Sequence, residues 1–131
     1  MDPWVVIVTS LALMFYFTTS LQVGRARGRL GVKAPAMTGH PDFERLCRIQ
    51  GNTLEWLVIF LPSMWMFAAL INAKVAAGLG AVWIVGRILY AMGYSKDAAK
   101  RGPGFAIQAL PTLILLLGSL VGGVLKLVHG G

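Results

Sequence analysis

Four apolar stretches, each long enough to cross a bilayer as a helix, dominate this chain of 131 residues. A transmembrane helix needs about 20 mainly apolar residues, and the run from Trp4 to Val23 contains no charged side chain. Further spans are expected at about residues 43–71, 75–94 and 105–128. Only 13% of all residues are charged, about half the fraction typical of a soluble domain. The sequence predicts a single domain over residues 1–131: an all-α integral membrane protein, a four-helix bundle with antiparallel, up-down helices.

Lysine and arginine gather at the ends of these spans. The net charge is +7, but no soluble basic face interleaved with aromatics is present, so nucleic acid is not an expected partner. Anionic lipid head groups are the expected partners of these basic residues. The predicted loop at 24–41 carries four basic residues and the loop at 95–104 carries three. The positive-inside rule therefore predicts that both loops are cytoplasmic and that the termini lie on the opposite side, in a bacterial inner membrane or the endoplasmic reticulum.

The remaining reactive residue types give little indication of chemistry of their own. A single cysteine, Cys47, excludes an internal disulfide framework and is interpreted as a packing residue. His40 and His129 have no spacing suited to a shared ligand, so no metal site is expected.

The first span is interpreted as a membrane helix rather than a signal peptide, because no basic residue precedes it and it is too long. Asp42 is expected to cap the second helix.

Charged and polar side chains inside the spans are the main functional signal, because an ionisable group in hydrocarbon is costly. In the second span, Arg48, Asn52 and Glu55 are separated by four and three residues and so share one helix face. In the third span, the matching stripe is Arg87, Tyr90 and Tyr94. Together these stripes predict a cationic pocket with one acid in its wall.

Such a pocket suits a small ligand that carries several carboxylates and one ammonium. Arginine binds carboxylates in a bidentate fork, Glu55 can bind an ammonium, and Asn52 offers both donors and acceptors. Glutathione, with two carboxylates, an ammonium and a thiol, fits this description. The competing structural interpretation is that Arg48 and Glu55 neutralise each other or hold helices together, and spacing alone leaves both open.

The segment FERLCRIQGNTLEW resembles the MAPEG family, and so do SLQVGRARGRLGV before the loop, TGHPDFER at the start of the second span and GRILYAMGYSKDAAKR at the end of the third. MAPEG proteins are membrane-associated proteins of eicosanoid and glutathione metabolism, and the likeness is greatest to the branch of leukotriene-forming conjugases and small microsomal glutathione transferases. The resemblance implies a four-helix protomer, a homotrimer, and glutathione bound between adjacent protomers near the cytosolic face.

The resemblance also assigns roles to individual residues. Arg101 matches the arginine that stabilises the glutathione thiolate. The positions that match glutathione-binding residues are Arg27, Arg48, Gln50, Asn52, Glu55, Trp56, Arg87, Tyr90 and Tyr94. Trp56 stands where the leukotriene enzymes have tyrosine, Gly28 where they have a further arginine, and Leu113 where they have tryptophan. These departures favour a generalist detoxification enzyme over a dedicated leukotriene synthase.

The leading hypothesis is therefore a glutathione transferase or peroxidase whose second substrate is a lipophilic electrophile or lipid hydroperoxide. Two alternatives belong to other classes. One is a non-catalytic lipid-binding scaffold like the lipoxygenase-activating protein, against which the presence of Arg48, Asn52, Glu55, Tyr94 and Arg101 argues. The other is a small four-helix drug exporter, which would need a membrane-embedded acid that the first span lacks.

Overall fold

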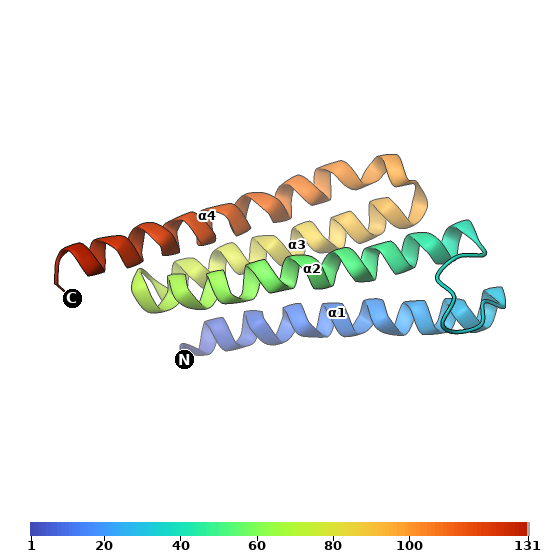
Figure 1. The fold of residues 1–131 in the computed structure, drawn as a ribbon, viewed down its shortest axis with the longest axis horizontal. Coiled ribbons are helices and arrows are strands. Elements are labelled where there is room, and N and C mark those ends of the chain that lie inside the picture. The colour runs from blue at the N-terminus through green and yellow to red at the C-terminus, as the bar shows by residue number, and fades with distance from the viewer. Residues whose placement is uncertain (131) are drawn as a thin grey trace.

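A computed structural model describes residues 1–130 and contains four long helices that lie side by side (Figure 1). They are α1 (Pro3–Leu30), α2 (Pro41–Leu70), α3 (Ala73–Lys96) and α4 (Gly102–Val128), with a short 3-10 turn, η1 (Ala98–Arg101), before α4. Successive helices run in opposite directions, as predicted. The segment between α1 and α2 and the turn η1 lie at one end of the bundle, and both ends of the chain lie at the other.

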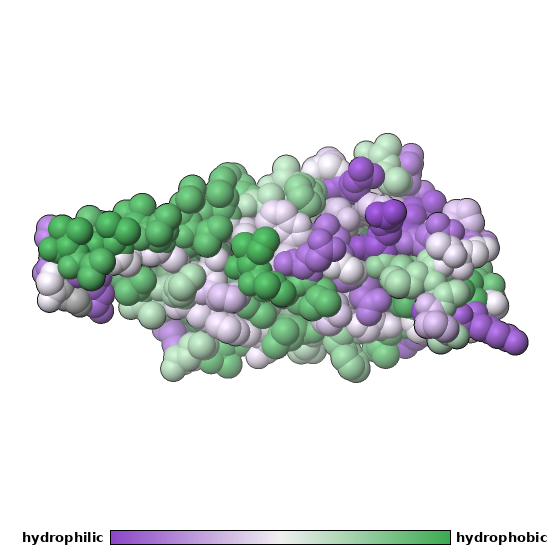
Figure 2. Space-filling model, in the orientation of Figure 1, coloured by the Kyte–Doolittle hydropathy of each residue, from purple (hydrophilic) through white to green (hydrophobic). Residues whose placement is uncertain are grey.

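All four helices are long and apolar enough to cross a membrane. Large hydrophobic side chains are exposed along each of them, including Phe17 on α1, Val58 on α2, Val85 on α3 and Leu120 on α4. Figure 2 shows hydrophilic residues gathered at the end that carries η1, while the opposite end of α4 is apolar. An apolar exterior with one polar end is the surface expected of a bundle whose solvent is mainly lipid.

Helix α1 is longer than the sequence predicted, and the prediction of a loop from residue 24 was wrong. The expected loop from residue 24 onwards is helical up to Leu30, so Arg25, Arg27 and Arg29 lie on α1. Arginine is a good helix former, and Gly24 and Gly28 do not interrupt the helix. Gly31 ends it with a φ of 70°, a left-handed conformation that glycine adopts without steric cost. The connection to α2 is therefore only residues 31–40.

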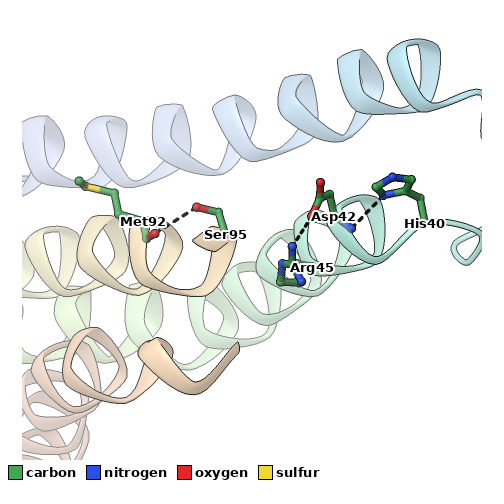
Figure 3. Close-up of polar contacts among 5 residues, drawn as sticks. All are labelled: His40, Asp42, Arg45, Met92 and Ser95. Carbon is green, nitrogen blue, oxygen red and sulfur yellow. Dashed lines mark hydrogen bonds and ion pairs between the residues drawn. The ribbon is translucent and has the colours of Figure 1, made fainter. Parts of the chain in front are cut away.

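Two other local predictions were wrong. The side chain that caps α2 belongs to His40, whose Nδ1 accepts a hydrogen bond from the backbone N–H of Asp42 at 3.1 Å (Figure 3); the Asp42 carboxylate pairs with Arg45 instead. The predicted loop at 95–104 is mostly structured, because α3 continues to Lys96 and α4 begins at Gly102. Asp97 caps η1 between them by accepting from the N–H of Ala99 at 3.0 Å.

The larger apolar cluster lies in the half of the bundle that is distant from η1, and a smaller one, which includes Val23 of α1 and Phe43 of α2, lies near the η1 end. The rings of Phe60 on α2 and Trp83 on α3 stack with centroids 4.2 Å apart, and both side chains are fully buried. Helices α3 and α4 approach closely at two glycines, Gly86 of α3 and Gly104 of α4. A Cβ on Gly86 would collide with the backbone of Gln108, and one on Gly104 with the backbone of Tyr90. Small residues at these crossings fix the position of α3 against α4.

Candidate functional site

A polar cavity of about 820 Å³ opens near the η1 end of the bundle. Helix α2 provides one wall, the last turns of α3 and the end of η1 provide another, and the connection before α2 contributes Met37 and Thr38. The residues that line it are Met37, Thr38, Glu44, Cys47, Arg48, Gly51, Asn52, Glu55, Tyr90, Tyr94 and Arg101. Six of the ten predicted site residues are therefore gathered in one place. We refer to it as the polar cavity.

Arg48 and Glu55 face this cavity without neutralising each other. Among residues 1–130, the ion pair present is Arg45 with Asp42, and neither Arg48 nor Glu55 makes a side-chain hydrogen bond within the chain. Both side chains are exposed. The second acid of the lining, Glu44, accepts from the backbone N–H of Gly39 at 3.3 Å and so is engaged with the connection. The cavity therefore presents a free guanidinium and a free carboxylate about two helical turns apart.

Asn52 is held in place from α3. The fully buried Arg87 donates from Nη1 to Asn52 Oδ1 and from Nη2 to Thr53 Oγ1, both at 2.7 Å. The Arg87 guanidinium also lies 4.3 Å from the centre of the Tyr90 ring. With its carbonyl oxygen occupied, Asn52 is left to offer its N–H₂ donors toward the cavity. Arg87 does not line the cavity itself; it orients a residue that does.

Tyr90, Tyr94 and Arg101 form the opposite wall. The two tyrosine rings lie 5.5 Å apart, and the Arg101 guanidinium lies 5.5 Å from the centre of the Tyr94 ring. Arg101 Nη1 donates to the carbonyl oxygen of Ala98 at 2.8 Å, within η1. Because Arg101 ends the short turn that Asp97 caps, its charge is set at the rim of the cavity on a constrained segment.

Three predicted residues lie elsewhere in the single chain. Arg27 donates to the carbonyl oxygen of Ala36 at 2.7 Å and lies over the Phe43 ring, so it ties the connection to α1. Gln50 faces α1 and donates to Ser20 Oγ at 3.0 Å. Trp56 packs edge-on against Phe105 of α4, with centroids 5.3 Å apart.

Some of the residues that build the site carry no recognisable signal in the sequence. Thr53 supports Arg87 across 34 positions of sequence, a pairing that depends on the register between α2 and α3. Met37, Thr38 and Gly51 line the cavity without any spacing pattern that would mark them. Cys47 is buried, in keeping with a packing residue, but it also contributes to the wall. No cluster of three potential metal ligands occurs within the described part of the chain.

The fold and composition define a multi-pass membrane protein, and comparison with known proteins identifies the family. The MAPEG family model matches residues 5–121, so this chain belongs to the MAPEG family. It is 43% identical to human microsomal glutathione S-transferase 2 over 86% of this chain and 76% of that protein. It is 36% identical to leukotriene C4 synthase of Cavia porcellus, with the same two coverages. An uncharacterized protein of Synechocystis is 51% identical over 90% of this chain and 86% of its own length.

Proposed function

We propose that this protein is a membrane-embedded glutathione transferase with peroxidase capacity. It binds glutathione in the polar cavity, holds the sulfur as thiolate, and delivers it to lipophilic electrophiles or lipid hydroperoxides from the bilayer. Relatives named glutathione S-transferase and leukotriene C4 synthase support this proposal. The observation that carries it is the pair of free, opposite charges, Arg48 and Glu55, in a cavity that also holds Asn52 and Arg101.

The proposed binding mode follows from matching charges. A glutathione carboxylate pairs with the Arg48 guanidinium, whose fork matches carboxylate geometry. The ammonium of the γ-glutamyl end pairs with Glu55, and the Asn52 N–H₂ group donates to a peptide or carboxylate oxygen. Tyr90 and Tyr94 supply hydroxyls and ring faces along the peptide. A volume of about 820 Å³ lies within the range typical of small-ligand sites.

Arg101 is the proposed catalytic residue. A free thiol with a pKa near 8.5 is only a few per cent ionised at neutral pH. A guanidinium against the sulfur favours the anion, and each unit by which the thiol pKa falls corresponds to about 1.4 kcal/mol. The thiolate then forms a carbon–sulfur bond with the electrophile, while a leaving group departs with the bond's electron pair or a strained ring or conjugated double bond opens and takes up a proton. With a hydroperoxide, it attacks the terminal oxygen and releases the alcohol, and a second glutathione converts the resulting sulfenic acid into glutathione disulfide and water.

The proposed assembly is a homotrimer, which accounts for Arg27 and Gln50. These residues lie on the α1–α2 side of the chain and outside its own polar cavity. In the proposed trimer, this side of one copy closes the cavity of the next, so that Arg27 and Gln50 of one protomer contact glutathione held by its partner. The bilayer boundary between copies then gives a lipophilic substrate access to the sulfur. The η1 end is proposed to face the cytoplasm.

Calorimetric titration of glutathione into the detergent-purified protein tests the binding step. We expect saturable binding in the wild type and at least tenfold weaker binding in Arg48→Ala. Lys74→Ala, in an exposed residue at the other end of the bundle, is the matched control and retains wild-type affinity. No heat of binding in a folded wild-type sample would contradict the proposal and favour the non-catalytic lipid scaffold instead.

A further inference from the structure

A second cavity, of about 500 Å³, lies between α1 and α3 and shares no lining residue with the polar cavity. It uses a different face of α2, contributed by Leu46 and Ile49. We refer to it as the α1–α3 cavity. Neither the proposed glutathione chemistry nor the larger apolar cluster uses it.

The lining of the α1–α3 cavity is apolar at one end and carries two cations at the other, with the neutral polar side chains of Thr18, Thr19 and Gln22 between them on α1. Phe15 of α1 and Ile88 of α3 lie at one end, and Arg25 and Arg29 lie toward the end that carries η1. Arg29 follows Phe15 by 14 positions, which at 1.5 Å per residue is about 21 Å along the helix axis. Figure 3 shows Met92 and Ser95 on the last turns of α3, where the Ser95 hydroxyl donates to the Met92 carbonyl oxygen. The cavity therefore has the polarity profile of an amphiphile whose head lies at the polar end.

The two arginines have no acidic partner within residues 1–130. They follow each other by one turn of α1, both are exposed, and neither forms an ion pair or a side-chain hydrogen bond there. The Asp42 carboxylate is engaged by Arg45, as Figure 3 shows. Two adjacent guanidiniums without a counter-ion form a site for an anion with several acceptor oxygens.

We propose that the α1–α3 cavity binds an anionic phospholipid, with its phosphodiester at Arg25 and Arg29 and the start of an acyl chain against Ile88 and Phe15. Basic pockets between transmembrane helices bind anionic lipid head groups. A membrane lipid is favoured over a soluble phosphate, because the cavity continues from its cations onto apolar side chains within the spanning part of the helices. A soluble anion would leave that apolar part uncovered.

Lipid titration of the detergent-purified full chain tests this site. The probes are dioleoylphosphatidylglycerol, dioleoylphosphatidylcholine and inorganic phosphate, and the readouts are native mass spectrometry and the unfolding temperature. We expect one phosphatidylglycerol retained per chain, with at least tenfold preference over phosphatidylcholine. The double variant Arg25→Gln, Arg29→Gln is expected to bind phosphatidylglycerol about tenfold more weakly.

The matched control removes two charges from the same end but outside the cavity: Lys33→Gln with Lys96→Gln. It is expected to weaken phosphatidylglycerol binding less than threefold. An equal loss in both double variants would overturn the proposal, because it would show that the lipid is attracted by the overall positive charge of this end rather than by the cavity. Stabilisation by inorganic phosphate at the same concentration would overturn it in favour of a soluble anion. Ala91→Phe fills the cavity while keeping both arginines, so it tests the site even if the arginine variant does not fold. Loss of phosphatidylglycerol binding in Ala91→Phe would support the proposal, and unchanged binding would overturn it.

Discussion

The two halves of the bundle use the same pair of helices for different purposes. In the half distant from η1, α2 and α3 meet through the fully buried stack of Phe60 and Trp83. In the half near η1, the same helices meet through Arg87, Asn52 and Thr53, and a polar cavity opens beside them. The first contact is apolar and closed, and the second is polar with unpaired groups at its edge. The difference indicates that α2 and α3 are joined by apolar packing in one half and by polar contacts beside the candidate ligand site in the other.

The largest expected effect is on stability, in the apolar half. Phe60→Ala removes a fully buried ring from the stack with Trp83, and truncations of this kind cost about 3–5 kcal/mol. Val58→Ala, at a position 67% exposed on the same helix, is the control and should change the free energy of unfolding by less than about 1 kcal/mol. Denaturant or thermal unfolding in detergent measures both. Equal effects would show that the stack is not a centre of stability.

Arg87 is the point where the two halves meet, and its replacement should affect both properties. Arg87→Met keeps a long side chain but removes both hydrogen bonds, each worth about 1.5–3 kcal/mol when one partner is charged. We expect lower stability and, because Asn52 loses its support, about tenfold weaker glutathione binding, seen in KM more than in kcat. Arg87→Lys keeps the positive charge but lacks the forked guanidinium, so its stability and glutathione affinity should lie between those of wild type and Arg87→Met. Unchanged glutathione affinity in Arg87→Met would show that Arg87 does not support glutathione binding through Asn52.

The two acids of the polar cavity give a finer comparison. Glu55 is free, whereas Glu44 accepts from the N–H of Gly39. Glu55→Gln should therefore weaken glutathione binding five- to tenfold, and Glu44→Gln less than threefold. N-acetylated glutathione, which lacks the ammonium, should bind wild type and Glu55→Gln equally well. A persisting difference with that analogue would mean that Glu55 does not contact the ammonium.

The residues that share one helix face were predictable from sequence, and the individual side-chain contacts between helices were not. The spacing of Arg48, Asn52 and Glu55 is sufficient to place them on one face, and the cavity contains all three. The bond from Arg87 to Asn52 spans 35 positions and depends on how far α3 is shifted along α2. That register is fixed by packing, including the close approach of α4 at Gly86.

The end of α1 shows a second limit of local reasoning. Glycines at 24 and 28 suggested a loop, but α1 continues through both and ends at Leu30 before Gly31. A glycine costs a helix interior only about 1 kcal/mol, which tertiary packing overcomes. The positions of Arg25 and Arg29 on a helix, and hence the α1–α3 cavity, could not be anticipated from a loop assignment.

The most direct test of the central claim is the ultraviolet thiolate absorbance of glutathione bound to the purified protein, recorded as a function of pH. We predict a thiolate signal at neutral pH for wild type, with the thiol pKa lowered one to two units from its ordinary value near 8.5. In Arg101→Ala the signal should be absent at pH 7 and return as the pH rises above 8.5, and turnover should fall about 10- to 100-fold at neutral pH and recover in parallel. Bound glutathione that remains a thiol at pH 7 in folded wild-type protein, or an identical titration in Arg101→Ala, would contradict the account.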